Sequence, residues 1–150
     1  AKFGVSGLSM GGISTYALFN QYSDITAAAS LMGNADPARF AKWTISSVWM
    51  TGATQEQCEA LEAEIEKNKA FLDAMAIAKH PEHINNRPLF LWHGTADDKV
   101  PYELNKEFFE TIKDEAYAKN VEWHETPGEG HRVPHQVFEA VADFFQKVFQ

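Results

Sequence analysis

The stretch Lys2-Phe3-Gly4-Val5-Ser6-Gly7-Leu8-Ser9-Met10-Gly11-Gly12 decides the fold that we expect for this chain. Its first part has the apolar side chains of a short buried strand, and residues 13–22 continue it with the pattern of a helix. Between them stands Gly-x-Ser-x-Gly, in which Gly7 and Gly11 flank Ser9. This order predicts a sharp strand-to-helix turn with Ser9 at its tip, where the glycines leave room for a strained backbone and its close neighbours.

A serine on such a turn is a candidate nucleophile. The helix that follows directs its N-terminal N–H groups toward the serine, where negative charge develops on a substrate oxygen. We therefore expect the backbone N–H of Met10 to be one oxyanion donor. The alternative is a strand-to-helix turn with an incidental serine, and the flanking elements favour the nucleophile.

Strands and helices alternate along most of the chain. Residues 25–32, 88–93 and 121–126 are the expected strands, although the alanines of the first also suit a helix. The last of these strands alternates apolar and polar residues, which is typical of a sheet edge. Apolar stripes predict helices over residues 104–112 and after Pro134. The alternation predicts an α/β fold with a mostly parallel sheet of about four strands and flanking helices.

Residues 34–81 have a different character and predict a helical insertion into a single domain that covers residues 1–150. Asp36-Pro37 is a helix cap followed by a first helical position. Thr54 and Gln57 form a capping box at the head of a longer helix, which we expect to run past Ile65 toward Ala78.

Two tryptophans of this insertion are candidate substrate-binding residues. Trp43 and Trp49 are either the inner face of a lid helix or the wall of an acyl-group pocket. Both roles are compatible in an enzyme, because a lid over the serine also forms part of the substrate wall.

Three expected loops at the carboxyl ends of strands each carry one side chain suited to acyl transfer: Ser9, Asp97 and His131. A serine hydroxyl needs a base with a pKa near 7, and the imidazolium that results needs a fixed carboxylate. The alternatives are that Asp97 only caps the following helix, with Asp98 as the acid, and that His131 is a surface histidine. We expect His93 to shape its loop by hydrogen bonding.

Composition limits the partners. The 13 Lys and Arg against 21 Asp and Glu give a net charge of -8, and no basic cluster suggests a nucleic-acid partner. A single cysteine, Cys58, predicts no internal disulfide and a reducing compartment, the cytoplasm. The chain has no apolar run of about 20 residues, so we predict no membrane span. Four histidines lack metal-like spacing with one another, so we predict no metal site at His80, His83, His124 and His135.

The three motifs resemble the catalytic loops of α/β-hydrolase esterases, in particular the branch similar to dienelactone hydrolases and prolyl-oligopeptidase-type serine hydrolases. They are Gly-Leu-Ser-Met-Gly-Gly, His93-Gly-Thr-Ala-Asp97-Asp-Lys-Val-Pro101 and Pro-Gly-Glu-Gly-His131. The resemblance implies that Ser9 attacks, that His131 transfers the proton and that Asp97 orients the histidine. It implies no metal and no organic cofactor. Dienelactone hydrolases proper carry cysteine as nucleophile, so Ser9 favours ordinary ester chemistry.

Such hydrolases have eight strands, and the strand before the nucleophile is the fifth. The resemblance therefore covers the C-terminal half of that fold and implies that the loop donating the second oxyanion N–H is not in this chain. We expect a fragment or truncated chain that is weakly active or inactive alone and self-associates through the strand edge at residues 2–8.

The resulting prediction is a serine hydrolase that cleaves small-molecule carboxylic esters through an acyl-serine. Two alternatives stay open: a serine peptidase of the prolyl-oligopeptidase type, and a non-catalytic binding or structural domain that keeps the loops.

Overall fold

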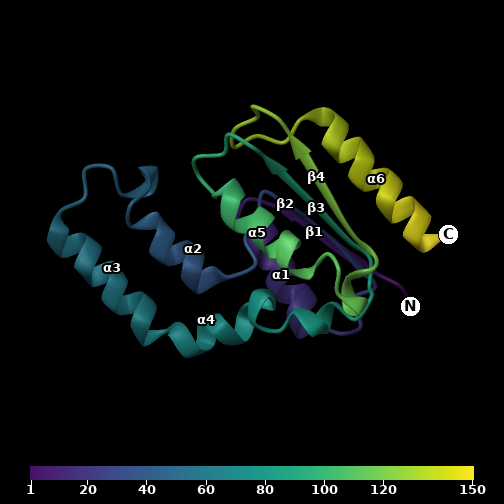
Figure 1. Cartoon of the computed structure of the whole chain (residues 1–150), viewed down its shortest axis with the longest axis horizontal. Coiled ribbons are helices and arrows are strands. Elements are labelled where there is room, and N and C mark those ends of the chain that lie inside the picture. The colour runs from purple at the N-terminus through teal and green to yellow at the C-terminus, as the bar shows by residue number, and fades with distance from the viewer.

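Four short strands form one parallel sheet in the computed structural model, which covers residues 1–150 (Figure 1). They lie side by side in the order in which they follow one another along the chain: β1 (Gly4–Leu8), β2 (Ala27–Leu31), β3 (Leu89–Gly94) and β4 (Val121–Thr126). The predicted α/β class and the four-stranded parallel sheet are confirmed. All four carboxyl ends therefore lie at one end of the sheet.

Three helices cover the two faces of this sheet: α1 (Met10–Gln21), α5 (Tyr102–Ile112) and α6 (His135–Phe149). Successive strand residues point to opposite faces. In β3, Leu89 and Leu91 join the core cluster formed with α1 and α5, whereas Phe90 and Trp92 join the cluster formed with α6. Figure 1 shows α6 on one side of the sheet and α1 with α5 on the other.

The two edge strands differ in their exposure. β4 keeps the expected alternation, because Trp123 packs toward the core while Glu122 and His124 face outward. The expectation of a buried strand before Ser9 holds only for Val5, which packs against the core, because Leu8 in β1 is 43% exposed and Phe3, just before β1, is 45% exposed. The physical reason is its position, since β1 has a neighbouring strand on one side only.

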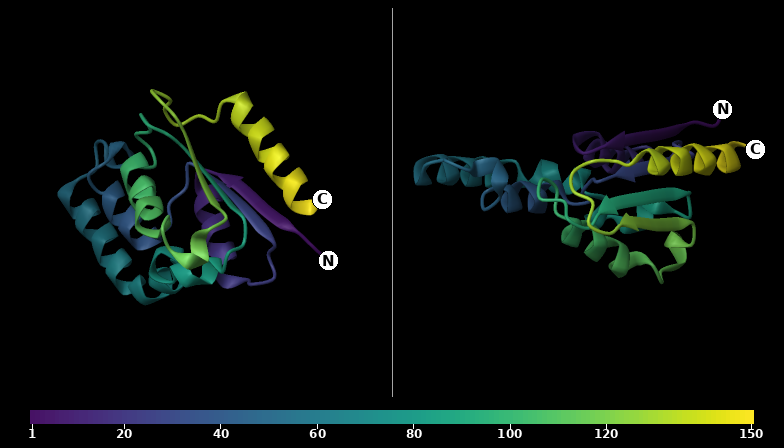
Figure 2. Two further views of the ribbon diagram at one scale, coloured as in Figure 1. Left: turned by 45° about the vertical axis from the view of Figure 1, so that its right-hand side comes forward. Right: turned by 90° about the horizontal axis from the view of Figure 1, so that it is seen from above.

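A block of helices connects β2 to β3 and reaches away from the sheet (Figure 2). It contains α2 (Pro37–Thr44), α3 (Gln55–Lys67) and α4 (Lys69–Met75), together with short 3₁₀ helices η1 (Val48–Met50), η2 (Ile77–Lys79) and η3 (Pro81–Ile84). A last 3₁₀ helix, η4 (Ala116–Ala118), precedes β4. The predicted caps are present, because Asp36 accepts the N–H of Arg39 and Thr54 forms a capping box with Gln57.

The predicted long helix over residues 54–78 is interrupted. Asn68 separates α3 from α4 with φ −101° and ψ 8°, and its side-chain amide donates to the carbonyl of Glu64 at 2.8 Å. A side chain that bonds its own preceding turn competes with the regular helix ladder. In the same way, the hydroxyl of Thr44 donates to Ala41 O at the end of α2.

Candidate active site

Ser9 lies at the turn between β1 and α1 in a conformation that is rare for a side-chain-bearing residue, with φ 57° and ψ −119°. Its N–H donates to Leu31 O and its carbonyl accepts the N–H of Ile13, each at 3.0 Å. These two bonds attach the turn to β2 on one side and to α1 on the other. Met10 is the first residue of α1, so its N–H has no acceptor within the helix.

The glycines around Ser9 have unequal roles. A Cβ at Gly7 would overlap the carbonyl oxygen of Gly11, and one at Gly12 would lie 2.6 Å from Leu31 O. A Cβ at Gly11 would meet nothing within 4 Å. The expectation that both glycines of the motif make room for neighbours therefore holds for Gly7 and is wrong for Gly11. The second close approach belongs to Gly12, which packs against the end of β2.

The structure brings Ser9, His131 and Asp97 together in one hydrogen-bonded row. Ser9 Oγ lies 2.8 Å from His131 Nε2, and His131 Nδ1 lies 2.8 Å from Asp97 Oδ2. The three side chains come from the ends of β1, β4 and β3 respectively. Neighbouring parallel strands present their carboxyl ends together, which is why residues so distant in sequence meet here.

Asp97 is held as a carboxylate. Its Oδ1 accepts the N–H groups of Lys99 at 2.9 Å and Val100 at 3.0 Å. Burial alone raises the pKa of this group, but hydrogen bonds from His93, Val100, His131 and Lys99 outweigh it and lower the pKa to about 2. An ionised carboxylate only accepts, so His131 Nδ1 carries the proton. His131 Nε2 is then free to accept the hydroxyl proton of Ser9.

The neighbouring carboxylate, Asp98, is exposed. The helix-capping alternative for Asp97 is wrong, because α5 has no side-chain cap and the carboxylate instead accepts N–H groups in the loop before it while it contacts His131.

A row of buried, hydrogen-bonded polar side chains supports the Asp97 loop. His93 Nε2 lies 2.9 Å from Val100 O and 3.4 Å from Asp97 Oδ2, and its Nδ1 lies 2.9 Å from Asn105 Nδ2. The hydroxyl of Tyr16 donates to Asn105 Oδ1 at 2.7 Å, which directs the Asn105 amide nitrogen toward His93. Because Asn105 donates to Nδ1, His93 carries its proton on Nε2 and donates it toward Val100 and Asp97.

The expected loop-shaping role of His93 is thus visible in its contacts, while the sequence reasoning missed Tyr16 and Asn105. A signal for Asn105 exists, because it is a polar residue beside the apolar stripe of its helix. The structure buries Asn105 completely.

The two candidate substrate-binding tryptophans occupy different surroundings. Trp49 Nε1 donates to Lys99 O at 2.6 Å, so this side chain joins the helical block to the loop of Asp97. It is 55% exposed. Trp43 instead stacks on Phe40 within α2, with ring centroids 6.1 Å apart.

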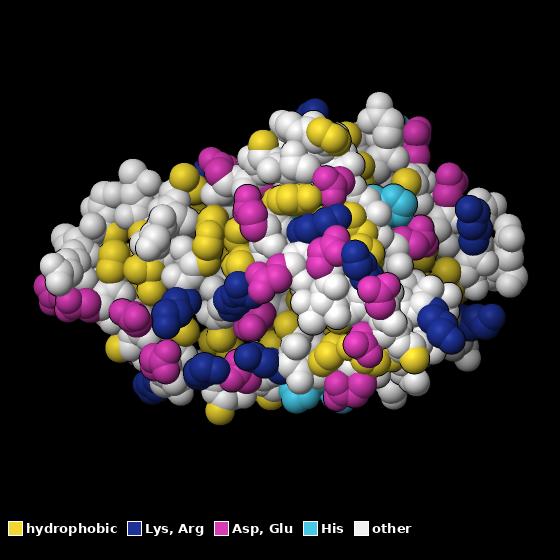
Figure 3. Space-filling model, viewed as in Figure 1, with side chains coloured by type: hydrophobic (Ala, Val, Ile, Leu, Met, Phe, Trp, Pro, Cys, Tyr) yellow, Lys and Arg dark blue, Asp and Glu magenta, His cyan; other side chains and the backbone are white.

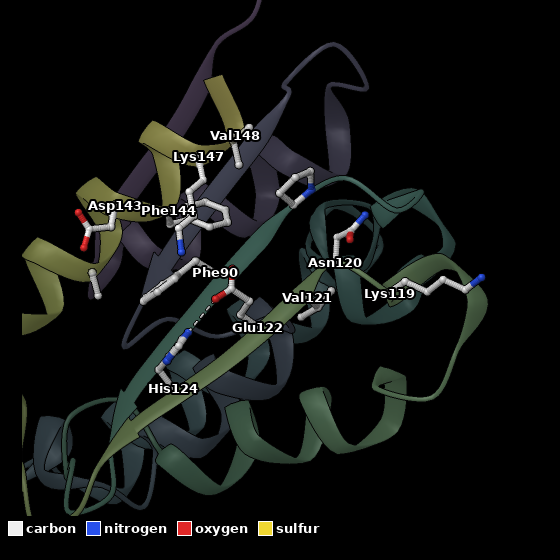
Figure 4. A pocket seen from close by; sticks show the side chains of 12 residues that line it. Phe90, Lys119, Asn120, Val121, Glu122, His124, Asp143, Phe144, Lys147 and Val148 are labelled. Carbon is white, nitrogen blue, oxygen red and sulfur yellow. Dashed lines mark hydrogen bonds and ion pairs between the residues drawn. The ribbon is translucent and has the colours of Figure 1, made fainter. Parts of the chain in front are cut away.

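Other surface features lie apart from Ser9. A hollow of about 520 Å³ lies between β4 and α6, and Phe90, Glu122, His124 and Lys147 are among its lining residues (Figure 4). On the face shown in Figure 3, acidic and basic side chains are interspersed.

None of the helices has the length and apolar character needed to cross a membrane. Two of the histidines for which we predicted no metal site, His80 and His83, lie together with Glu82.

The sheet, its flanking helices and the loop positions are those of the α/β-hydrolase fold. The sequence matches the prolyl oligopeptidase family over residues 1–150, and the chain belongs to this family.

Two curated relatives carry esterase names. The chain is 28% identical over 148 residues to "Putative esterase YitV" of Bacillus subtilis (strain 168), covering 97% of this chain and 56% of that protein. It is 25% identical over 146 residues to "Esterase YjfP" of Escherichia coli (strain K12), again covering 97% of this chain and 56% of the relative. The chain thus spans about half the length of these relatives.

A solved structure with a similar fold is the Pyrococcus horikoshii acylaminoacyl peptidase. It superimposes with a TM-score of 0.71 at 18% identity, covering 96% of this chain and 23% of the peptidase. At the level of the family, these comparisons place the chain among hydrolases.

Proposed function

We propose that this chain carries the catalytic triad of a serine hydrolase that cleaves carboxylic esters of small molecules through an acyl-serine intermediate. The observation that carries the proposal is the continuous row from Ser9 Oγ through His131 to Asp97, with both contacts at 2.8 Å. It begins on a turn whose strained backbone exposes the hydroxyl ahead of a helix N-terminus. A strained serine in this setting is typical of a nucleophile.

In the proposed reaction, Ser9 Oγ attacks the ester carbonyl while His131 Nε2 takes the hydroxyl proton. The Met10 N–H donates to the oxyanion that forms on the former carbonyl oxygen. Collapse of this intermediate breaks the ester C–O bond, and His131 returns the proton to the departing alcohol. Water, deprotonated by the same Nε2, then attacks the acyl-serine and releases the carboxylic acid and free Ser9.

Asp97 acts through His131 and does not contact the substrate in the proposed reaction. Its carboxylate keeps the Nδ1–H tautomer of His131 and stabilises the imidazolium that forms in each step. The low pKa of Asp97, about 2, keeps it ionised throughout the neutral range.

We further propose that the helical block over residues 34–81 acts as a lid. The contact of Trp49 with Lys99 O supports this role, because it brings an exposed aromatic ring beside the loop of Asp97. Trp43, packed on Phe40, would support the lid from within α2. A lid of this kind would shape the acyl-group side of the site. The cytoplasmic location expected from the single cysteine remains a prediction.

The second candidate function is a serine peptidase, and the family membership of the chain is the observation that favours it. The same triad serves both reactions, so the two candidates differ in the leaving group. Ester hydrolysis is preferred here because the curated relatives carry esterase names. Turnover of a p-nitrophenyl ester compared with an aminoacyl p-nitroanilide separates the two.

Labelling with a fluorophosphonate probe tests the proposed nucleophile. We expect Ser9 Oγ to displace fluoride and form a stable phosphonyl adduct, which mass spectrometry of the digested chain locates on Ser9. Ser9→Ala removes the adduct. Ser14→Ala is the matched control, because Ser14 is an exposed serine further along the same helix.

Covalent labelling needs only one attack by Ser9, whereas turnover also needs deacylation of the serine, so labelling is the more sensitive readout. A chain that is folded but neither labels at Ser9 nor hydrolyses esters would support the non-catalytic alternative and contradict the proposal.

A further inference from the structure

Three side chains with metal-binding atoms gather far from Ser9. His80, Glu82 and His83 each offer one ligand atom, and these atoms all lie within 4.8 Å of one another. They belong to η3 and the residue before it, directly ahead of β3. Asp97 follows the other end of β3, so this cluster lies at the opposite end of the sheet from the proposed active site.

The ring of His83 is oriented by a buried amide. Its Nδ1 lies 2.9 Å from Asn20 Oδ1, and Asn20 Nδ2 donates to Ala74 O at 3.0 Å. The bond to Ala74 fixes which end of the Asn20 amide faces the histidine, so His83 Nδ1 must carry the proton. His83 Nε2 then presents its lone pair on the side of Glu82, whose Oε1 lies 3.8 Å away.

This arrangement is the one that metal-binding histidines usually have. The ring nitrogen that does not bind the ion donates to a carbonyl or carboxylate, which fixes the tautomer and the ring orientation. Asn20 is only 6% exposed, so the orienting group is itself rigidly placed. An isolated surface histidine has no need of such a partner.

The second histidine is positioned by the backbone of the same turn. The His83 N–H donates to His80 O at 3.0 Å, and Pro81 begins the 3₁₀ helix between them. The two imidazole rings are nearly parallel, at 13°, with centroids 5.2 Å apart. The side chain of His80 makes no hydrogen bond, so its ring nitrogens remain available.

The surrounding charge is mixed. Glu82 supplies a negative charge, while the nearby Arg87 guanidinium donates to the carbonyls of His83, Phe19, Tyr22 and Ile25. Its charge lowers the affinity for a cation without blocking the ligand atoms, because its N–H groups are directed at backbone oxygens.

We propose that His80, Glu82 and His83 form a binding site for a divalent first-row transition metal ion of the Zn²⁺ type. Two imidazole nitrogens and one carboxylate oxygen are ligands that Zn²⁺ accepts, with water completing a tetrahedral set. Ca²⁺ and Mg²⁺ prefer all-oxygen ligands and are excluded by the two histidines. Through His83 and Asn20, the ion connects η3 to α1 and strengthens the point where the helical block returns to the sheet.

Calorimetric titration of the 150-residue chain with ZnCl₂ near neutral pH tests the site. We expect one Zn²⁺ per chain, with binding weakened at least tenfold in His80→Ala and in His83→Ala. Asn20→Ala removes no ligand, yet loss of an orienting partner typically weakens metal binding by about 10- to 100-fold. Titration with CaCl₂ or MgCl₂ should give no comparable binding.

Two further variants keep the test independent of folding. Glu82→Gln removes a ligand from an exposed side chain without touching Asn20, and Zn²⁺ should raise the thermal midpoint of the wild type by more than that of this variant. His135→Ala is the matched control, because His135 also pairs with a glutamate, Glu139 at 3.2 Å, and both side chains are exposed. It should bind Zn²⁺ as the wild type does. The proposal is overturned if the wild type binds no Zn²⁺, or if the double variant His80→Ala/His83→Ala keeps the wild-type affinity.

Discussion

Ser9 holds a backbone conformation that costs free energy, and the surrounding bonds to Leu31 and Ile13 maintain it. Placing a side chain at φ 57° exposes the hydroxyl at the tip of the turn, within 2.8 Å of His131 Nε2. The strained backbone thus orients a reactive group. The free-energy cost of this strain can be measured by replacing the serine.

We expect Ser9→Gly to be more stable than Ser9→Ala. Both variants lose the hydroxyl and its bond to His131, but only alanine keeps a Cβ in the strained conformation. Relief of strain of about 1–3 kcal/mol, less the greater flexibility of unfolded glycine, leaves a difference of about 1 kcal/mol. Urea unfolding monitored by circular dichroism measures it.

The matched control for this prediction is Ser14, which is exposed within α1. At an ordinary helical position alanine is more stable than glycine by about 1 kcal/mol, so the order of the two variants should reverse there. An alanine variant at position 9 that equals or exceeds the glycine variant would show that the turn is not strained.

Asp97 predicts a dependence of stability on pH. Its folded pKa of about 2 lies below the ordinary value of 3.8. A lowered pKa means that the carboxylate stabilises the fold above the unfolded pKa, and that this stabilisation is lost as the pH falls through the folded pKa. The difference between the two pKa values corresponds to about 2–3 kcal/mol of folding stability, which is lost between about pH 5 and pH 2.

Denaturant unfolding at several pH values measures this loss. In Asp97→Asn the loss attributable to Asp97 should be absent, because that side chain no longer titrates. Asp98→Asn should keep the wild-type profile, since Asp98 is exposed. An acid profile that is unchanged in Asp97→Asn would argue against the depressed pKa. In activity, Asp97→Asn should reduce ester turnover by roughly 10⁴-fold, because the wrong histidine tautomer is favoured.

At the scale of elements, the strands were the most predictable part. The apolar run over residues 88–93 and the alternation over residues 121–126 correspond to β3 and β4, because the period of side chains along a strand follows directly from burial. Helix ends were less predictable. The break at Asn68 depends on a side-chain bond to Glu64 O that competes with the helix, and residue periodicity carries no sign of that competition.

The residues of the candidate site also divide into those that the sequence predicts and those that it does not. Ser9, Asp97 and His131 were identified because each follows a predicted strand in a loop with distinctive composition. Tyr16 and Asn105 were missed because each lies within a helix. The contact of Tyr16 with Asn105, and that of Asn105 with His93, depend on how α1 and α5 pack. Side-chain partners across two packed helices are a tertiary property.

The packing of β1 against α1 predicts opposite effects for two glycines of one motif. Gly7→Ala places a methyl group against the backbone of Gly11, which has no flexible end to move, so we expect strong destabilisation and loss of Ser9 labelling. Gly11→Ala meets open space inside a helix, where alanine is favoured over glycine by about 1 kcal/mol at most. Thermal unfolding of both variants measures the contrast. Equal destabilisation by the two substitutions would contradict it.

At the scale of the whole molecule, helices cover both faces of the sheet, but its β1 edge has no strand beside it (Figure 1). Phe3 O accepts the Thr26 N–H, and Ser9 N–H donates to Leu31 O. Backbone groups alternate in direction along a strand, so the N–H and C=O groups of Gly4, Ser6 and Leu8 point away from β2. They are flanked by exposed apolar side chains at Phe3 and Leu8. An unpaired strand of this kind is a template for pairing with another chain.

We propose that two copies of this chain associate through β1. Ser6→Pro removes an outward N–H at the centre of the strand, and proline is tolerated where that N–H does not serve the sheet. The variant should remain folded by circular dichroism and shift the mass measured by light scattering from dimer toward monomer over a concentration series. Ser6→Ala is the control, because it changes the same side chain and keeps the N–H. A wild type that is monomeric at every concentration, or a Ser6→Pro variant with the wild-type dimer fraction, would contradict pairing through this edge.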